Sequence, residues 1–217
     1  MKHVTKMMLV VAVLAMVAVT AQAAVITPTD VSAPTVNAAW FSAVNAINGN
    51  GLDGVGNVED QLHRASDHSL NDHWQQNSTS SFSAITFDLG SAMDVGAAYV
   101  WNCALWDGAG DQTGRGVQNT TIEVSTDGVN FASLGTFTFA QASLASSSDS
   151  IAAEIVNFDS IQTDVRYVKF GITSNYGDSA RTGLSEVRFD TVPEPATMTL
   201  LGLGGVMVLV RRKRRAC

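Results

Sequence analysis

The sequence predicts an all-β protein, a jelly-roll β-sandwich of about eight strands flanked by an N-terminal signal peptide and a C-terminal short transmembrane helix. Three observations support the sandwich. Between residues 24 and 190, apolar residues recur with a period of two or in short runs, without sustained helical spacing. The chain has 18 glycines against four prolines, as loop-rich β proteins do. Apolar residues make up 46% of 217 residues, enough for one domain core.

The first element is a leader at residues 1–23. Lys2 and Lys6 precede an apolar run at 7–19, and a small-residue cleavage pattern ends at Ala23. The apolar run spans only about 20 Å as a helix, whereas the bilayer core is roughly 30 Å thick. We therefore expect a secretory signal peptide that is cleaved after Ala23. An uncut membrane anchor is the alternative, and it fits this length less well.

The domain predicted at residues 24–190 contains the strands. Asp127 and Gly128 separate two strand-like runs, which predicts a hairpin with a two-residue type I′ turn. Residues 165–172 alternate apolar with polar side chains, so one face of that strand should meet a core and the other water. The predicted strands are 44–48, 82–89, 95–102, 118–126, 130–139, 151–158, 164–172 and 184–190.

Cys103 is the one cysteine in this domain, since Cys217 lies in the C-terminal segment. A disulfide within the domain is therefore excluded. The strand-like sequence around Cys103 predicts a buried, inert thiol, and Trp101 in the same strand is expected in the core.

Charge is unevenly distributed along the chain. Residues 24–195 hold six basic and all twenty acidic residues, so their net charge is −14, and basic residues at both ends bring the whole chain to −7. An acidic domain would repel a phosphate backbone, and we expect no nucleic acid partner.

The last predicted segment covers residues 191–217. A Pro-Glu-Pro motif at 193–195 precedes fifteen residues, 196–210, that are apolar apart from two threonines, and 211–215 are all Arg or Lys. A basic cluster stays on the cytoplasmic side of a membrane, so the preceding domain should lie outside. The order of motif, apolar helix and basic cluster resembles the PEP-CTERM sorting signal of Gram-negative bacteria.

This resemblance implies that an exosortase in the inner membrane recognises Pro193, Glu194 and Pro195 and cuts near them. The protein would then be anchored transiently in the inner membrane and reach the cell surface or the extracellular matrix. Carriers of this signal tend to accompany extracellular polysaccharide production. A tail anchor that is never processed is the alternative.

Five segments of the domain carry a second resemblance. The first is Phe-Ser-Ala-Ile-Thr-Phe-Asp-Leu-Gly at 82–90, and the last is Gly-Leu-Ser-Glu-Val-Arg-Phe at 183–189. With 99–102, 114–128 and 165–170 between them, they look like successive strands of the discoidin, or coagulation factor V/VIII C-type, domain. That family has a galactose-binding-like jelly-roll fold. Its members mostly bind ligands, commonly glycans or phospholipid headgroups, through loops at one end.

Two loops supply candidate ligand-binding residues. A sugar needs a flat aromatic ring for its apolar face and planar polar groups for its hydroxyls. Trp106 and Tyr176 are the candidate rings, and Arg115 and Asn175 the hydrogen-bonding groups, if their loops meet at one end of the sandwich. In the alternative reading, both rings only cover the edge of the sandwich. The same loops contain Asp107 and Asp178.

The discoidin resemblance also implies a structural calcium ion, held by the loop after the first strand and an acidic residue on the last. The corresponding residues here are Asn48, Asn50 and Asp53 in loop 47–54, and Glu186. Asn48 stands where an Asp is more usual, which lowers the negative charge. A glycine-rich turn without an ion is the alternative.

His63, His68 and His73 recur every five residues and suggest a zinc site. Steps of five do not share a helical face, so solvated loop histidines are the simpler interpretation. A metal-dependent hydrolase built on these residues is a third functional hypothesis.

The combined features favour an exported, noncatalytic protein that binds extracellular polysaccharide or another glycan. The alternative is a structural matrix or adhesin protein that binds other proteins. The acidic domain favours neutral sugars over anionic lipids.

Overall fold

The computed structural model describes residues 24–35, 40–67, 71–77 and 82–191. The predicted signal peptide and the sorting segment after Thr191 lie outside these residues. In the described part, one eight-stranded sheet has the order β1-β12-β5-β11-β8-β9, with β2 paired to β5 and β4 paired to β12. Two two-stranded sheets, β3 with β10 and β6 with β7, accompany it. All of these strand pairs are antiparallel.

The strands are β1 (Ala24–Ile26), β2 (Asp30–Ser32), β3 (His63–Arg64), β4 (Trp74–Asn77), β5 (Ala84–Asn102), β6 (Trp106–Asp107), β7 (Gly110–Asp111), β8 (Val117–Ser125), β9 (Ala132–Thr138), β10 (Ser150–Ile151), β11 (Glu154–Asn175) and β12 (Arg181–Thr191). The short 3₁₀ helices are η1 (Ala43–Ala46), η2 (Val58–Asp60) and η3 (Thr113–Arg115).

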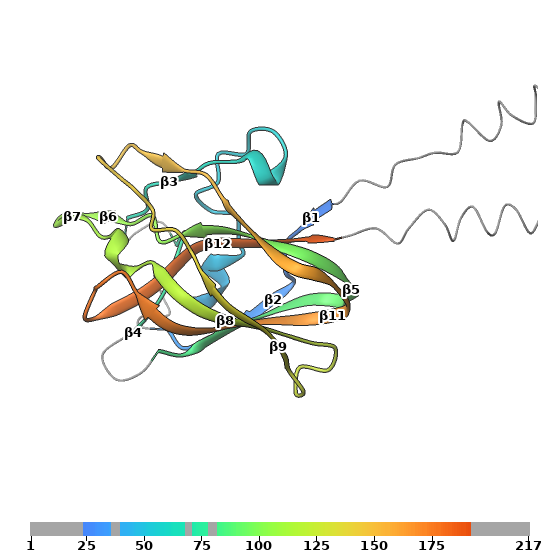
Figure 1. Cartoon of the computed structure of the whole chain (residues 1–217). Helices are drawn as coiled ribbons and strands as arrows, with labels where there is room; N and C mark the ends of the chain where they lie inside the picture. The colour runs from blue at the N-terminus through green and yellow to red at the C-terminus, as the bar shows by residue number, and fades with distance from the viewer. Residues whose placement is uncertain (1–23, 36–39, 68–70, 78–81, 192–217) are drawn as a thin grey trace, which may run out of the picture. The chain divides into compact units, whose positions relative to one another are not determined.

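Two long strands divide the large sheet into two layers. The first half of β5 pairs with β2 and with the second half of β11, whereas the second half of β5 pairs with β12 and with the first half of β11. The register between β5 and β11 shifts between Asn157 and Tyr167 of β11, where both strands bend. Figure 1 shows both strands curving together at one end of the sandwich. The prediction of a jelly-roll β-sandwich is therefore confirmed.

The core lies between these layers and is aromatic at its centre. Phe189 of β12 belongs to one layer and meets Phe87 and Phe170 of the other, with ring centroids 5.5 and 6.2 Å apart. Phe139 packs against Phe170 at 5.4 Å. All four rings are fully buried, and their tilted contacts suit the edge-to-face preference of aromatic side chains.

Several predicted strands merge or disappear. The runs at 82–89 and 95–102 form the single strand β5, and the runs at 151–158 and 164–172 both lie within β11 apart from residues 151–153. The strand predicted at 44–48 is wrong, because residues 43–46 form η1. There Ala43 and Ala46 are buried, and Asn45 donates to the carbonyls of Trp40 and His73.

The hairpin between β8 and β9 is present, but the predicted two-residue turn is wrong. Residues 126–131 connect the strands, and of Asp127 and Gly128 only Gly128 has positive φ. Asp127 instead accepts hydrogen bonds from the backbone amides of Val129 and Asn130. These bonds lower the pKa of Asp127, and they stabilise a wider loop than a type I′ turn.

The interior residues singled out in the sequence lie where they were predicted. Trp101 is fully buried, and Cys103 is a free, buried thiol. Burial raises the pKa of Cys103 to about 12, so this thiol stays protonated and unreactive at neutral pH. Among the described residues there is no helix long and apolar enough to cross a membrane.

We predict that Phe170→Ala lowers the free energy of unfolding by about 3–5 kcal/mol, because it removes the ring that contacts both layers. Ile155→Ala on the same strand is the control. Ile155 is 54% exposed, so its loss should cost no more than about 0.5 kcal/mol. Urea unfolding measures both, and equal costs would contradict this view of the core.

Candidate functional site

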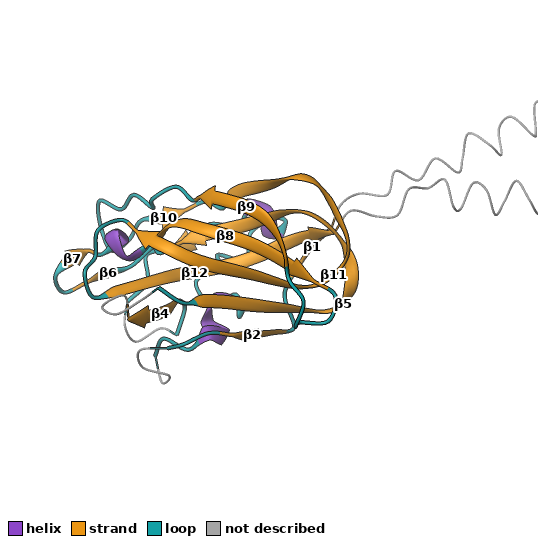
Figure 2. Cartoon of the chain, turned by 60° about the horizontal axis from the view of Figure 1, so that its bottom comes forward, coloured by secondary structure: helices purple, strands orange, loops and turns teal. Residues whose placement is uncertain are grey.

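The two predicted ligand-binding loops meet at one end of the sandwich. The amide of Asp178 donates to the carbonyl of Gly114, and the amide of Tyr176 donates to that of Gly116, each at 3.3 Å. The β6–β7 hairpin and the start of β12 lie at this end, far from the end where β1 begins and β12 finishes (Figures 1 and 2). We call residues 103–116, 139–141 and 175–181 the loop end.

Arg115 links the two loops. Its Nε donates to the Asp178 carboxylate at 3.2 Å, and one terminal nitrogen donates to Gln112 at 2.9 Å and lies 3.9 Å from Asp107. The other terminal nitrogen is buried and has no hydrogen-bond partner within the described part of the chain. The guanidinium is therefore held in one orientation by groups from both loops.

The two candidate rings are both partly buried. Trp106 packs against a small apolar cluster of Ala65, Ala104 and Leu144. The hydroxyl of Tyr176 donates to the carbonyl of Phe139, so this ring is anchored at its polar end. Each ring therefore covers part of the sandwich edge and keeps part of its surface in solvent.

Asn175 lies in the predicted loop, and its side chain is engaged by groups of that loop and of the start of β12. Its side-chain nitrogen donates to the carbonyls of Asp178 and Arg181, and its side-chain oxygen accepts from the amide of Gly177. Both ends of the amide are thus engaged within the loop. Asn175 shapes the loop that carries Tyr176.

Trp40 is a third partly exposed aromatic residue, and it was not among the predicted binding residues. It is 49% exposed and meets Phe41 edge-on at 6.4 Å. The guanidinium of Arg181 lies over Phe41 at 5.6 Å, which connects this pair to the loop end. The available signal was the position of Trp40 and Phe41 outside every predicted strand, where an aromatic side chain has no sheet to cover.

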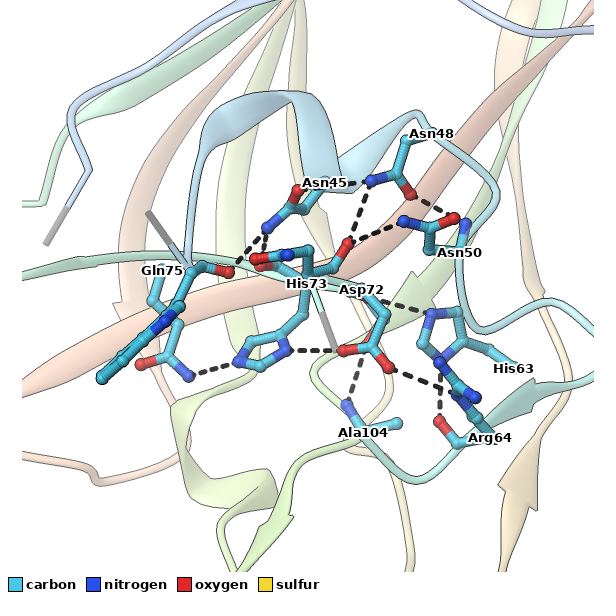
Figure 3. Close-up of polar contacts among 12 residues, drawn as sticks. Asn45, Asn48, Asn50, His63, Arg64, Asp72, His73, Gln75 and Ala104 are labelled. Atoms are coloured by element: carbon cyan, nitrogen blue, oxygen red, sulfur yellow. Dashed lines mark hydrogen bonds and ion pairs between the residues drawn. The ribbon is translucent and has the colours of Figure 1, made fainter. Parts of the chain in front are cut away.

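A buried polar network lies beside loop 47–54 (Figure 3). His73 contacts Asp72 through Nδ1 at 3.1 Å and Gln75 through Nε2 at 2.9 Å. His63 contacts the carbonyl of Arg64 through Nδ1 and that of Asp72 through Nε2. Figure 3 shows both rings enclosed by these partners.

These contacts bear on the zinc hypothesis. All four ring nitrogens of His63 and His73 face protein groups, and His68 lies outside the described residues. Among the residues that the structure describes, no group of three or more His, Cys, Asp or Glu side chains is arranged to hold a metal ion.

The residues predicted for calcium are close together, but their donor atoms do not fit the ion. The side-chain nitrogens of Asn48 and Asn50 both donate to the carbonyl of Asn71. The Asp53 carboxylate accepts from the amide of Val55. Calcium needs six to eight oxygens directed to one point, and in the present conformation these side chains are directed elsewhere.

Glu186 is the fourth predicted calcium ligand, and it is completely buried. Burial raises the pKa of its carboxyl, whereas the Arg188 charge and the Gly49 amide lower it and favour the ionised form. The carboxylate accepts a hydrogen bond from the Gly49 amide at 3.0 Å and forms an ion pair with Arg188. A positive charge therefore already lies against this carboxylate.

Comparison with known proteins shows which family models match the chain. A family model described as F5/8 type C domain matches residues 30–187, and one described as PEP-CTERM protein-sorting motif matches residues 191–215. The F5/8 type C domain of a Bacteroides fragilis protein has a TM-score of 0.53 and 11% identity, with 80% of this chain and 99% of that chain covered. This similarity supports the fold.

Two further solved structures are similar at lower scores. Chitosan-binding module 1 of a chitosanase/glucanase from Paenibacillus sp. IK-5 has 17% identity and a TM-score of 0.48, covering 75% of this chain and 95% of that chain. The family 32 CBM of C. perfringens NanJ, in complex with galactose, has 14% identity and a TM-score of 0.46, covering 78% and 92%. No curated protein matches the chain.

The buried His63 predicts a pH-dependent stability. Burial lowers the pKa of His63 below its ordinary value of 6.5, against the opposing effects of the Arg64 carbonyl and the nearby Asp72. The unfolded chain therefore binds more protons than the folded chain below about pH 6.5, and acidification through this range should destabilise the fold.

The measurement is urea unfolding between about pH 5 and 7, comparing the native chain with His63→Gln. The native chain should lose more stability on acidification than the variant. An NMR titration of the imidazole gives a second readout. A His63 pKa at or above 6.5 would contradict the prediction.

Proposed function

The chain belongs to the F5/8 type C domain family, and we propose that it is an exported, noncatalytic protein that binds carbohydrate through its loop end. One observation carries this proposal. Partly exposed rings, Trp106 and Tyr176, and a fixed guanidinium, Arg115, lie in two loops that hydrogen-bond to each other at one end of a β-sandwich. A ring beside planar polar groups is the arrangement that a sugar requires.

Recognition would use the two kinds of group together. The exposed part of a ring packs against the apolar C–H face of a sugar, and the carboxylates that Arg115 holds in place accept hydrogen bonds from its hydroxyls. Because the ion pair with Asp178 already fixes Arg115, binding costs little side-chain entropy. We expect each site to be weak and binding to depend on several contacts.

The position of the loop end suits a surface protein. β1 starts at Ala24 and pairs with the end of β12 at Thr191, so both ends of the domain lie together. The loop end is at the other extreme of the sandwich (Figure 2). A domain held through its C-terminal segment would therefore keep the loop end available to extracellular material.

Charge narrows the ligand class. Residues 24–195 carry a net charge of −14, and Asp107 and Asp178 flank Arg115 at the loop end. Neutral sugars, or acidic ones bridged by cations, are more compatible with this surface than an anionic phospholipid membrane.

The signal peptide would direct export, and the C-terminal segment would direct the sorting that follows. In this proposal an exosortase recognises Pro193, Glu194 and Pro195 in the inner membrane and cuts near them, and the domain reaches the surface or matrix of a Gram-negative cell. The match of residues 191–215 to the PEP-CTERM motif supports this route. A role as a structural adhesin that binds other proteins is an outcome of the tests below.

The binding site is tested by retention on the polysaccharide of the producing cell and on a glycan array. Trp106→Ala and Tyr176→Ala should each weaken retention about tenfold, the effect of losing one aromatic contact of about 1.4 kcal/mol. Val129→Ala is the matched control, because Val129 is 80% exposed and lies in the β8–β9 loop, outside the loop end.

Thermal unfolding of each variant separates loss of binding from loss of fold. Trp40→Ala is measured in the same way. If only this variant weakens retention, the aromatic surface that contacts the sugar is the Trp40–Phe41 pair. If every variant binds as the native chain does, or the native chain retains only proteins, the carbohydrate proposal is wrong.

Mass spectrometry of the mature protein tests the sorting proposal. We expect an N-terminus at Ala24 and a C-terminus near Pro195, because the signal peptide and the segment after the motif should both be removed. A mature protein that keeps residues 211–215 would contradict exosortase processing. A strain without the exosortase should accumulate this longer form.

A further inference from the structure

Two opposite charges lie side by side in β12, most of whose residues are buried. Glu186 and Arg188 are two residues apart on β12, so their side chains project from the same face of that strand. Glu186 is fully buried, and Arg188 is only 4% exposed. They form an ion pair with each other and face loop 47–54.

The Arg188 guanidinium lies against loop 47–54 and contacts its backbone. Its Nη1 donates to the carbonyl of Ile47 at 2.9 Å. Gly49 has a φ of +73°, and a Cβ added there would lie 3.4 Å from the other terminal nitrogen of Arg188. The Gly49 amide in turn donates to Glu186. Loop carbonyl, loop amide, carboxylate and guanidinium therefore form one continuous joint between loop 47–54 and β12.

A loop carbonyl and a strand carboxylate are oxygen ligands of the kind that a hard divalent cation prefers. Here the Ile47 carbonyl and the Glu186 carboxylate both already contact the Arg188 guanidinium. A calcium ion at this position would have to displace the guanidinium, and Arg188 would then be a buried cation without its carboxylate, which is strongly unfavourable.

We propose that the Arg188 guanidinium takes the place of a structural calcium ion, so that the joint between loop 47–54 and β12 is a metal-independent, internal ion pair. The side chain neutralises Glu186 and binds the loop carbonyl, the two tasks that an ion would perform there. The sandwich then keeps its shape in calcium-poor surroundings or beside polysaccharides that sequester calcium. This inference does not depend on what the loop end binds.

The first experiment uses the native domain. Its thermal unfolding midpoint is measured in excess calcium and in EGTA, and we expect no difference between them. A bound calcium ion at about a hundredfold excess over its Kd would raise the midpoint by roughly 5–10 °C. A rise of this size in the native domain would overturn the proposal.

Direct binding gives a readout that needs no variant. Trp101 is the cross-strand partner of Glu186, so a lanthanide at this joint would lie close to an indole that can sensitise its emission. Terbium added to the native domain should give no sensitised emission that calcium competes away. Such emission would contradict the proposal.

The decisive variant is Arg188→Met, which removes the charge and keeps an apolar stem. It should unfold at a lower temperature than the native domain in EGTA, and calcium should raise its midpoint. The matched control is Glu186→Gln with Arg188→Met, which removes both charges and should not respond to calcium. If Arg188→Met folds but its unfolding midpoint does not change with calcium, the joint is not a cation site. The proposal that Arg188 takes the place of calcium would then be wrong.

Arg188→Lys covers the case in which Arg188→Met does not fold. An ammonium group keeps the charge on one nitrogen, whereas Arg188 uses Nη1 for the Glu186 carboxylate and the Ile47 carbonyl and has a second terminal nitrogen against Gly49. This variant should fold with a lowered midpoint that calcium leaves unchanged. A calcium-dependent midpoint in Arg188→Lys would count against the internal ion pair.

Discussion

The sandwich depends on two strands that belong to both of its layers. β5 and β11 each pass through the bend at which their register shifts. Each of these two strands therefore contributes one half to each layer. The bend brings Phe87 and Phe170 of one layer against Phe189 of the other. Because the two layers share continuous strands, the aromatic core and the sheet geometry cannot form independently of each other. This gives the loops a rigid base.

A second constraint is the set of buried polar groups beside loop 47–54. Apolar burial does not specify a single loop conformation, whereas a buried charge or imidazole is stable only with its partners in place. Glu186, Arg188 and His63 each bind backbone groups of this region. They therefore define how the loop and the segment around Asp72 sit against β12, at the cost of desolvating several polar side chains.

At the loop end, polar side chains also fix the conformation of surface loops through specific partners. Arg115 is held by Asp178, and Asn175 is occupied by the backbone of its own loop, so the loops have a defined shape before any ligand arrives. The rings of Trp106 and Tyr176 contribute apolar surface from this fixed frame. A noncatalytic binding protein needs such a frame, because preorganised side chains lose little freedom when a ligand binds.

The sequence by itself determined the fold class, the order of most long strands, the buried thiol of Cys103 and the two loops that carry the candidate binding residues. These follow from local patterns: period-two apolar runs, cysteine arithmetic and turn residues between strands. The family resemblances of both the domain and the C-terminal segment were also readable from local motifs, and the comparisons confirmed them.

Only the tertiary structure decided the rest, because it depends on which distant residues face each other. The apolar residues near Ala43 suit a short strand or a helical turn equally well, and contacts from Asn45 to His73 select the turn. Asn48 and Glu186 are residue types that bind calcium, but only the structure shows that they contact Asn71 and Arg188. Sequence patterns reveal residue types and spacing, whereas a site is defined by the direction of each donor atom, which packing sets.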